Sequence, residues 1–442
     1  MDDWRSPFDP DFRIEALSPA ALAVLAREYQ LAAHLQDRAG MPQVMVRHGA
    51  AAMREIAIAE WMGASPVYTR RMQRALGFEG DDVATIFKGM QFDVGAPHGF
   101  LDFRFRLNDD GSGEFWLPYC GALMDVEPMG ERHVVGMCHE IEDPTFDATA
   151  VATNPRARMR PIHRPPRVPP DRQPHCHWSV HIDAGASPLE EIELTRRVAS
   201  SRLARLEMPC ASASAASASA GGRDDYAGAL DPDLRLEDFS HRALQVIARE
   251  FCLQGHLLVR SFMNAIADRW GEEQAREIAD LQFTGSAGVA AERLTDAMHL
   301  RPSPADGGSK AVLDAIAKLF QIHPAFHPRA YVDLHVERRA EAVRCWLGDS
   351  EAFAEGDGNS WHALLAAAPE VHPALDAIVR SIDAQARCRT IEVKGARVAW
   401  EVIVDRSVEP APEATPVTIA KMSKGATFRF VARGRGEGST PS

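Results

Sequence analysis

The sequence predicts an α+β protein built as a tandem duplication, in which each copy packs N-terminal helices on a small antiparallel sheet. The first observation is an internal repeat. Residues 9–38 align with residues 231–260 without a gap, and 16 of the 30 positions are identical. The second is a helical spacing of apolar residues early in each copy, and the third is an alternating pattern with a hairpin turn further on. We therefore expect two equivalent units that pair around a pseudo-two-fold axis.

The elements of the first unit follow from these patterns in chain order. Apolar residues at helical spacing predict helices over 19–38, 42–62 and 67–76. Alternation over 103–107, the turn residues 109–113 and the return over 114–119 predict a β-hairpin. A helix over 143–152 and a final strand over 175–183 complete the sheet, and a helix over 189–206 follows it.

The repeat also predicts the domain boundaries. We expect an N-terminal unit over 9–207, which is the candidate active unit, and a degenerate C-terminal unit over 231–434. Residues 208–230 contain a run of alanine, serine and glycine, which is typical of a flexible linker. Residues 435–442 are expected to form a disordered tail.

Composition and charge exclude several classes of protein. The formal net charge is −13, so nucleic acid is not expected as a partner. No run of 18 uncharged apolar residues occurs, so no membrane span is predicted, and the acidic first residues lack an apolar signal core. We expect a cytoplasmic protein that acts on a small molecule, either as a monomer with paired units or as a homo-oligomer. Seven cysteines in a long chain do not indicate a disulfide framework.

The second copy serves as an internal comparison for the first. Trp116 and Trp178 recur as Trp346 and Trp400, which indicates core packing. A stripe that includes His34 and is also kept in the second copy is interpreted as a structural network. It consists of Arg27, Leu31, His34 and Arg38.

Other polar residues of the first copy are replaced in the second. Cys120 becomes Ser350, Cys138 and His139 fall opposite alanines, His163 becomes Glu392, and His175 becomes Arg397. Any chemistry is therefore predicted to lie in the N-terminal unit.

The final strand of the first unit carries a candidate metal site. Its period of two places His175, His177 and His181 on one face, and Cys176 with Trp178 on the core face. Three imidazoles could hold zinc, iron or copper. The alternative is a polar sheet face that happens to be rich in histidine, with no cofactor.

The cysteines form a second candidate site. Cys120, Cys138 and Cys176 are all replaced in the second copy, and the segment 156–172 nearby is rich in arginine. A thiolate beside histidines and arginines would have a lowered pKa and act as a nucleophile. The arginines would attract a carboxylate substrate. The alternatives are inert core thiols and a solvated, proline-rich surface strap.

Short motifs around these cysteines resemble a known family. The motifs are Tyr119-Cys120, then Met137-Cys138-His139-Glu140, then His175-Cys176-His177-Trp178. They resemble the L-2-amino-thiazoline-4-carboxylic acid hydrolase-like family over residues 20–183, with the second unit as a degenerate copy. The chain departs from the family at His177, where the family pattern has an acidic residue.

The resemblance implies hydrolytic opening of a carboxylate-bearing cyclic amidine at a C–N bond. Cys138 or Cys176 would be the nucleophile, with Cys120 nearby. His139 or His175 would serve as acid and base. The substrate would be bound by Arg164, Arg167 and His163. Two alternatives stay open: a metal-dependent, perhaps redox, enzyme that uses the histidines, and a non-catalytic small-molecule-binding protein.

Overall fold

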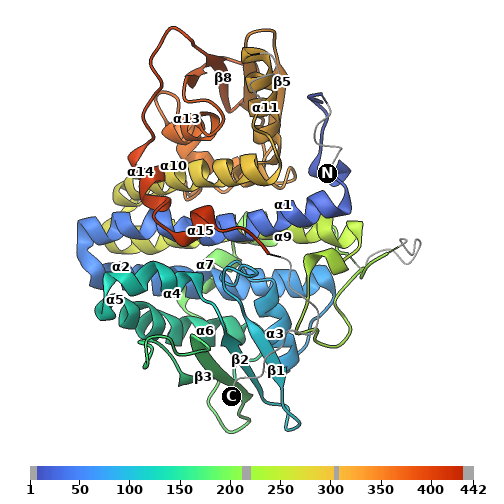
Figure 1. Cartoon of the computed structure of the whole chain (residues 1–442), viewed down its shortest axis with the longest axis vertical. Helices are drawn as coiled ribbons and strands as arrows, with labels where there is room; N and C mark the ends of the chain where they lie inside the picture. Colours follow the sequence, from blue (N-terminus) through green and yellow to red (C-terminus); the bar gives the residue numbers. More distant parts are fainter. Residues whose placement is uncertain (1–6, 212–220, 303–307, 432–442) are drawn as a thin grey trace.

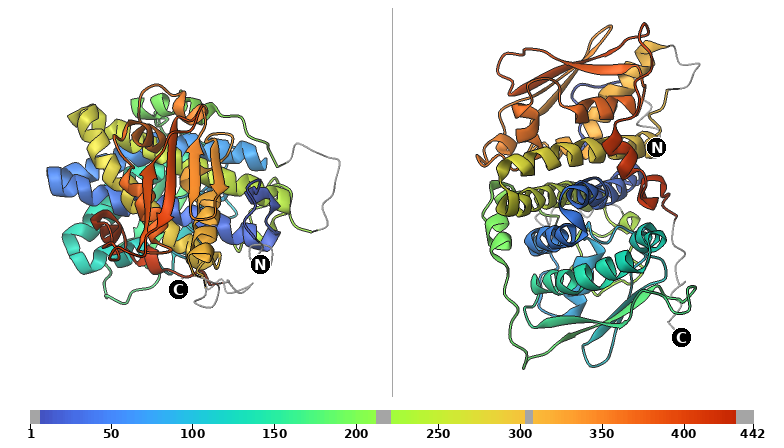
Figure 2. Two further views of the ribbon diagram at one scale, coloured as in Figure 1. Left: turned by 90° about the horizontal axis from the view of Figure 1, so that it is seen from above. Right: turned by 90° about the vertical axis from the view of Figure 1, so that its left-hand side faces the viewer.

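Two four-stranded antiparallel sheets lie at opposite ends of the molecule, and long helices fill the space between them (Figure 1). The computed structural model describes residues 7–211, 221–302 and 308–431. The predicted α+β class is confirmed. The right-hand view of Figure 2 shows the layers in order: sheet, short helices, two central layers of long helices, short helices and sheet.

The first unit begins with helices whose bounds differ from the predicted ones: the first ends earlier, at His34, and the second spans both of the next two predicted helices. Ser18 caps the first of them by accepting a hydrogen bond from the Ala21 N–H at 3.3 Å. The predicted breaks near Pro42 and Pro66 do not occur, because one helix continues through both prolines and bends instead at Gly49. Gly49 has a φ of 85°, which glycine adopts readily. The three helices are α1 (Pro19–His34), α2 (Gln36–Leu76) and α3 (Val83–Gln91).

The sheet of the first unit has the order β1-β2-β4-β3. Its strands are β1 (Arg104–Leu107), β2 (Gly113–Leu117), β3 (Ala157–His163) and β4 (Cys176–Ile182), which confirms the predicted hairpin and final strand. Trp178 is fully buried between Phe115 and Phe146. Short helices connect β2 to β3: α4 (Gly121–Val126), α5 (Glu131–Val135), a π-helical turn (Gly136–Ile141) and α6 (Glu142–Val151).

The second unit repeats this order of elements. Its sheet, of order β5-β6-β8-β7, has the same connectivity as the first sheet. The helices are α9 (His241–Trp270), α10 (Glu272–Ala297), α11 (Ser309–Ile322), α12 (Trp361–Ala367) and α13 (Pro373–Arg380). The strands are β5 (Leu334–Arg338), β6 (Val343–Leu347), β7 (Ala386–Thr390) and β8 (Val398–Val404).

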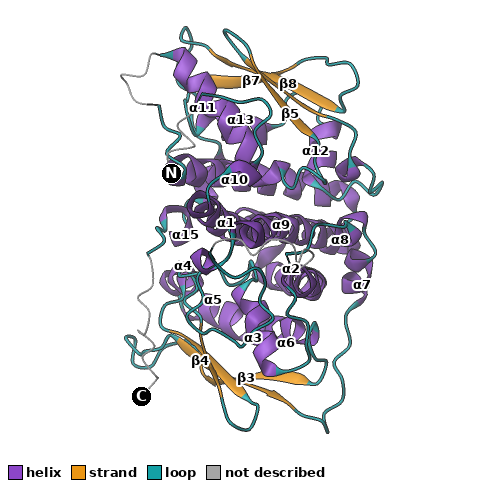
Figure 3. Cartoon of the chain, turned by 90° about the vertical axis from the view of Figure 1, so that its right-hand side faces the viewer, coloured by secondary structure: helices purple, strands orange, loops and turns teal. Residues whose placement is uncertain are grey.

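Each unit ends in two short helices that also touch the other unit. These arms are α7 (Glu193–Ala199) and α8 (Arg202–Arg205) in the first unit, and α14 (Thr415–Ala420) and α15 (Lys424–Thr427) in the second. The helix α7 packs on α2 and also on α9, while α14 packs on α10 and also on α2. Figure 3 shows α15 beside α4 of the first unit and α8 beside α9 of the second.

Two buried ion pairs join the units, and each links an arginine of one unit to a glutamate of the other. Arg293 Nε lies 2.8 Å from Glu28 Oε2, and Arg71 Nη2 lies 2.8 Å from Glu250 Oε1. The repeat aligns Glu28 with Glu250 and Arg71 with Arg293. The arginine of each unit therefore pairs with the glutamate of the other unit, and the two pairs use equivalent positions. This reciprocal arrangement is the pattern of a two-fold interface.

Glycines mark the closest approach between the units. A Cβ at Gly63 would lie 2.3 Å from Ser261 Oγ and 2.8 Å from Leu194 Cγ. At the aligned Gly285, a Cβ would lie 2.7 Å from the Pro416 carbonyl oxygen and 2.9 Å from Ala39 Cβ. Both positions need glycine because the helices of the two units leave no room for a side chain.

The predicted linker is narrower than 208–230. Ala211 donates its N–H to the Ala75 carbonyl at 2.9 Å, and Tyr226 is buried against Phe78 and Phe92. These ends of the segment pack on the first unit, while residues 212–220 and the predicted tail 435–442 lie outside the described residues. Across the described ranges, no helix is long and apolar enough to cross a membrane.

Candidate functional site

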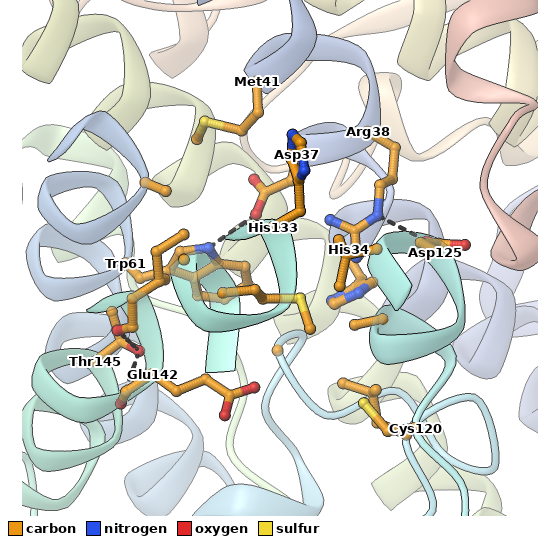
Figure 4. Close-up of a pocket in the computed structure, with 18 of the residues that line it drawn as sticks. His34, Asp37, Arg38, Met41, Trp61, Cys120, Asp125, His133, Glu142 and Thr145 are labelled. Atoms are coloured by element: carbon orange, nitrogen blue, oxygen red, sulfur yellow. Dashed lines mark hydrogen bonds and ion pairs between the residues drawn. The ribbon is translucent and has the colours of Figure 1, made fainter. Parts of the chain in front are cut away.

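A cavity of about 490 Å³ lies in the first unit between the long helices and the sheet. It is lined by residues of α1 and α2, of the short helices that connect β2 to β3, of the end of β2 and of the start of β4. Figure 4 shows ten of the lining side chains labelled. The second unit contributes Ile419, Met422 and Ser423 to its wall. A cavity of this size is typical of a small-molecule site.

Most of the lining is apolar, and methionine dominates it. Trp61, Phe103 and Phe146 contribute aromatic rings. Methionine side chains are unbranched and polarisable, so they adapt to ligands of different shape. Seven of the 15 methionines line the cavity: Met41, Met45, Met53, Met90, Met129, Met137 and Met422.

Glu142 is the carboxyl group that faces the predicted cysteines. It is the first residue of α6, directly after the π-helical turn, and protein surrounds it except on the side of the cavity. Burial raises the pKa of Glu142 to about 8, against the opposing effect of the nearby Arg164. The group is therefore mostly protonated at neutral pH and can donate a proton.

The structure brings the three predicted cysteines together. Cys120 and Cys176 line the cavity, and Cys138 is buried beside them in the π-helical turn. Burial raises the pKa of the Cys120 thiol to about 12 and raises the pKa values of Cys138 and Cys176 as well, with Glu142 adding to each shift. The prediction of a lowered thiol pKa is wrong, because these thiols are buried in an apolar wall rather than exposed to the arginines.

The predicted acid–base histidines have other partners. His175 is buried, and its Nδ1 accepts a hydrogen bond from the Cys120 N–H at 3.1 Å. Burial lowers the pKa of His175. His139 Nε2 lies 2.7 Å from the Pro165 carbonyl oxygen, to which it donates. Neither imidazole lines the cavity, so both hold the backbone around it.

The three predicted metal ligands do not converge on one point. His177 Nε2 lies 2.7 Å from Glu114 Oε2, His181 is exposed, and His175 is turned to Cys120. His163 lies beside His177, with ring centroids 6.1 Å apart, and burial lowers the pKa of His163 to about 4. Within the described part of the chain, no group of three or more histidine, cysteine, aspartate or glutamate side chains could hold a metal ion.

The predicted carboxylate-binding arginines are already paired. Arg164 forms an ion pair with Asp143 and lies over the Trp178 ring. Arg167 holds Glu127 with two hydrogen bonds, of 2.9 and 2.7 Å. Neither arginine lines the cavity, because the strap that carries them runs outside the sheet.

Several cavity residues are missing from the sequence prediction. His34, Asp37, Arg38 and Trp61 come from α1 and α2 and form the wall opposite Glu142 (Figure 4). His34 and Arg38 belong to the predicted structural network rather than to the predicted site, because they recur in the second copy. Asp37 and Trp61 align with Val259 and Phe283, so the same comparison that singled out the cysteines could have found them.

The equivalent space in the second unit is filled. Trp361 stacks on Phe283, the counterpart of Trp61, with ring centroids 4.6 Å apart. His256, the counterpart of His34, packs against Trp361, Tyr331 and His362. The cavity that touches both His256 and Trp361 measures only about 20 Å³.

Comparison of the chain with protein-family models, with curated proteins and with solved structures finds no match. The resemblance of the cysteine motifs to the thiazoline hydrolase-like family therefore stays a prediction.

Proposed function

We propose that the N-terminal unit is a hydrolase that binds a cyclic amidine in the methionine-lined cavity and opens it at a C–N bond. We also propose that the units arose by duplication and that the C-terminal unit has become a support. One observation carries the proposal: Glu142, a carboxyl group that keeps its proton at neutral pH, shares an apolar cavity with the thiols of Cys120 and Cys176.

Glu142 replaces the cysteines as the reactive group in this proposal. Water adds to the amidine carbon, the C–N bond breaks, and the departing nitrogen takes a proton from Glu142. The carboxylate that remains then recovers its proton from the water that was added. The buried thiols of Cys120 and Cys176 shape the wall beside the reacting carbon.

The arginines at the mouth of the cavity suit a carboxylate on the substrate. Arg132 lines the cavity and is exposed, and Arg54 lines it while paired with Glu140. A carboxylate that reached this mouth would meet the exposed guanidinium of Arg132. In this proposal Arg132 takes the role that the sequence assigned to Arg164 and Arg167.

A second candidate is a binding protein without catalysis. The size of the cavity and its seven methionines favour it, because an adaptable apolar wall suits a bulky ligand better than a compact ring. The two candidates share one site and differ only in the role of Glu142.

The decisive experiment measures hydrolysis of 2-amino-thiazoline-4-carboxylate and of larger cyclic amidines by the purified full chain. We expect Glu142→Gln to lower kcat by at least about 100-fold, the usual contribution of a general acid. The double variant Cys120→Ser and Cys176→Val carries the residues of the second unit, Ser350 and Val398, and should keep most of the turnover. Asp109→Asn in the exposed hairpin turn is the matched control.

Full turnover by Glu142→Gln with loss in the cysteine variant would restore the cysteines as nucleophiles. Tight binding of amidines without any turnover would leave the binding protein as the function.

A further inference from the structure

The wall of the cavity opposite Glu142 holds a pair of buried carboxyl groups. Asp37 Oδ2 accepts a hydrogen bond from Trp61 Nε1 at 2.9 Å, whereas Asp37 Oδ1 is buried without a donor. Glu60 is fully buried behind Asp37, and no N–H or hydroxyl group reaches either of its oxygens. The hydrogen bond open to Glu60 is the one to Asp37, which requires a proton on one of the two carboxyls.

The pair therefore holds at least one proton. Burial raises the pKa of both carboxyls, and the neighbouring Asp37 raises that of Glu60 further. Asp37 is the better placed of the two to carry a charge, because Trp61 Nε1 donates to it and Arg38 lies nearby, whereas Glu60 has no such donor. Arg38 lowers the pKa of Asp37 but forms its ion pair with Asp125, whose Oδ2 lies 3.0 Å from Arg38 Nε. Among the described residues Asp37 has no ion-pair partner of its own, and its Oδ1 accepts no hydrogen bond.

His34 stands in the same wall. It is 6% exposed, the backbone of Val94 lies within reach of its ring, and neither ring nitrogen makes a hydrogen bond of normal geometry. Burial and Arg38 lower the pKa of His34 to about 3, so the ring is neutral. In the second unit, His256 Nε2 donates to the His327 carbonyl oxygen at 2.8 Å. The histidine at this position makes a normal hydrogen bond in the second unit, where the space is filled, and makes none of normal geometry in the first unit, where the cavity is open.

The carboxyl groups of this wall are particular to the first unit. Asp37, Glu60 and Trp61 align with Val259, Gln282 and Phe283. The second unit has neither carboxyl nor the indole N–H at these positions, and it folds without them. A buried charge is costly, so its presence in one unit alone points to a role in binding.

We propose that the ligand of this cavity is a cation, a protonated amidine or amine on an apolar body, bound by Asp37 and His34 against the face of Trp61. The Asp37 carboxylate accepts an N–H and neutralises the charge, and His34 supplies a second hydrogen bond. The Trp61 ring and the methionine sulfurs suit the rest of the cation. The inference rests on the proposed function only for the location of the site, and it assigns the charge of the substrate.

The test is calorimetric titration of the full chain with three probes of nearly equal shape: benzamidinium, benzamide and benzoate. We expect benzamidinium to bind at least about tenfold more tightly than benzamide, the ratio that one charge-assisted hydrogen bond supplies. Asp37→Asn should abolish that preference and leave benzamide binding unchanged. Asp109→Asn is the control for the loss of one surface charge.

A second variant guards against a failure to fold. His34→Phe replaces the imidazole ring by one of similar size, and it should weaken both benzamidinium and benzamide by about tenfold. A preference for benzoate, or a preference for benzamidinium that survives Asp37→Asn, would overturn the inference. Loss of turnover in Glu142→Gln with the preference for benzamidinium over benzamide intact would bear on the proposed function and not on the charge of the ligand.

Discussion

The two units enclose the same space between helices and sheet, and they use it in opposite ways. In the first unit, Trp61 and His34 border a cavity of about 490 Å³. In the second, the counterparts Phe283 and His256 are covered by Trp361 and His362. The fold therefore does not require the cavity. Its open state in one unit is a property of particular side chains, which is what a binding site needs.

Features present in both units are features of the fold. Arg38 pairs with Asp125, which also accepts the N–H of Lys424 at 2.7 Å, and this contact ties α4 to the start of α15. In the second unit, Arg260 pairs with Glu355, which accepts the N–H of Leu203 at 2.7 Å. The contact borders the cavity in one unit and a packed core in the other, so we assign it to docking of the arms.

The largest expected effect tests the equivalence of the two units at their interface. Arg71→Met and Arg293→Met each leave a buried glutamate without its partner, which costs about 3–5 kcal/mol. The free energy of unfolding in urea should fall by similar amounts in the two variants. Adding Glu250→Gln to Arg71→Met should restore much of the loss. A loss below about 1 kcal/mol in either variant would contradict the burial of these pairs.

The next prediction opens the closed space. Trp361→Ala should lower the free energy of unfolding by about 3–5 kcal/mol, because it removes a buried indole and leaves a cavity against Phe283. Added indole should raise the melting temperature of this variant more than that of the unaltered chain, in which only the open cavity of the first unit is available. If indole stabilises both equally, the space next to Phe283 is not the counterpart of the open cavity.

Buried histidines should make stability fall on acidification, and His34 and His163 of the first unit contribute together with a larger group in the second. Burial lowers the pKa values of four histidines of the second unit to between about 3 and 4: His256, His323, His327 and His362. Below pH 6.5 these histidines are protonated in the unfolded chain but stay neutral in the folded chain. Stability should fall on acidification by about 1.4 kcal/mol per pH unit for each such histidine.

Buried carboxyl groups of the first unit should lower stability as the pH rises from about 4 to about 8. The pKa values of Asp93 and Glu142 are raised to about 6 and about 8, mainly by burial. As the pH rises above 4, the unfolded chain releases protons that the folded chain keeps, so stability falls until each folded pKa is reached. Glu142→Gln should flatten the loss between pH 6 and 8, and His256→Gln should flatten the loss below pH 6. Melting curves against pH would show whether either variant flattens the wrong side.

Much of the fold could be predicted from the sequence, because repeats, alternation and turn residues are local signals. The internal repeat gave the two units, and the kept Trp178 and Trp400 marked the core face of β4 and β8. The helix boundaries predicted next to Pro42 and Pro66 are wrong, since both prolines lie inside α2 and the bend falls at Gly49. A helix that is packed along its length tolerates a proline, and packing is not a local property.

The site was predicted only in part, because burial decides chemistry and burial is a property of the whole fold. The cysteines do meet, but the apolar wall raises their pKa values instead of lowering them. The arginines of the strap lie next to acidic partners that the sequence places far away, such as Glu127 for Arg167. Glu142 carries no sequence signal, because its raised pKa comes from burial beside the cavity.

Joining the two units in one chain changes what mutation can do to them. In an assembly of identical subunits, a substitution that opens one cavity opens its twin and doubles the cost in stability. Here a linker holds unequal halves at high effective concentration, so a costly group such as Asp37 is present once. The exchange of arms then lets the closed half contribute Ile419 and Met422 to the wall of the open one. Selection on the closed half can therefore act on a ligand that it does not itself enclose.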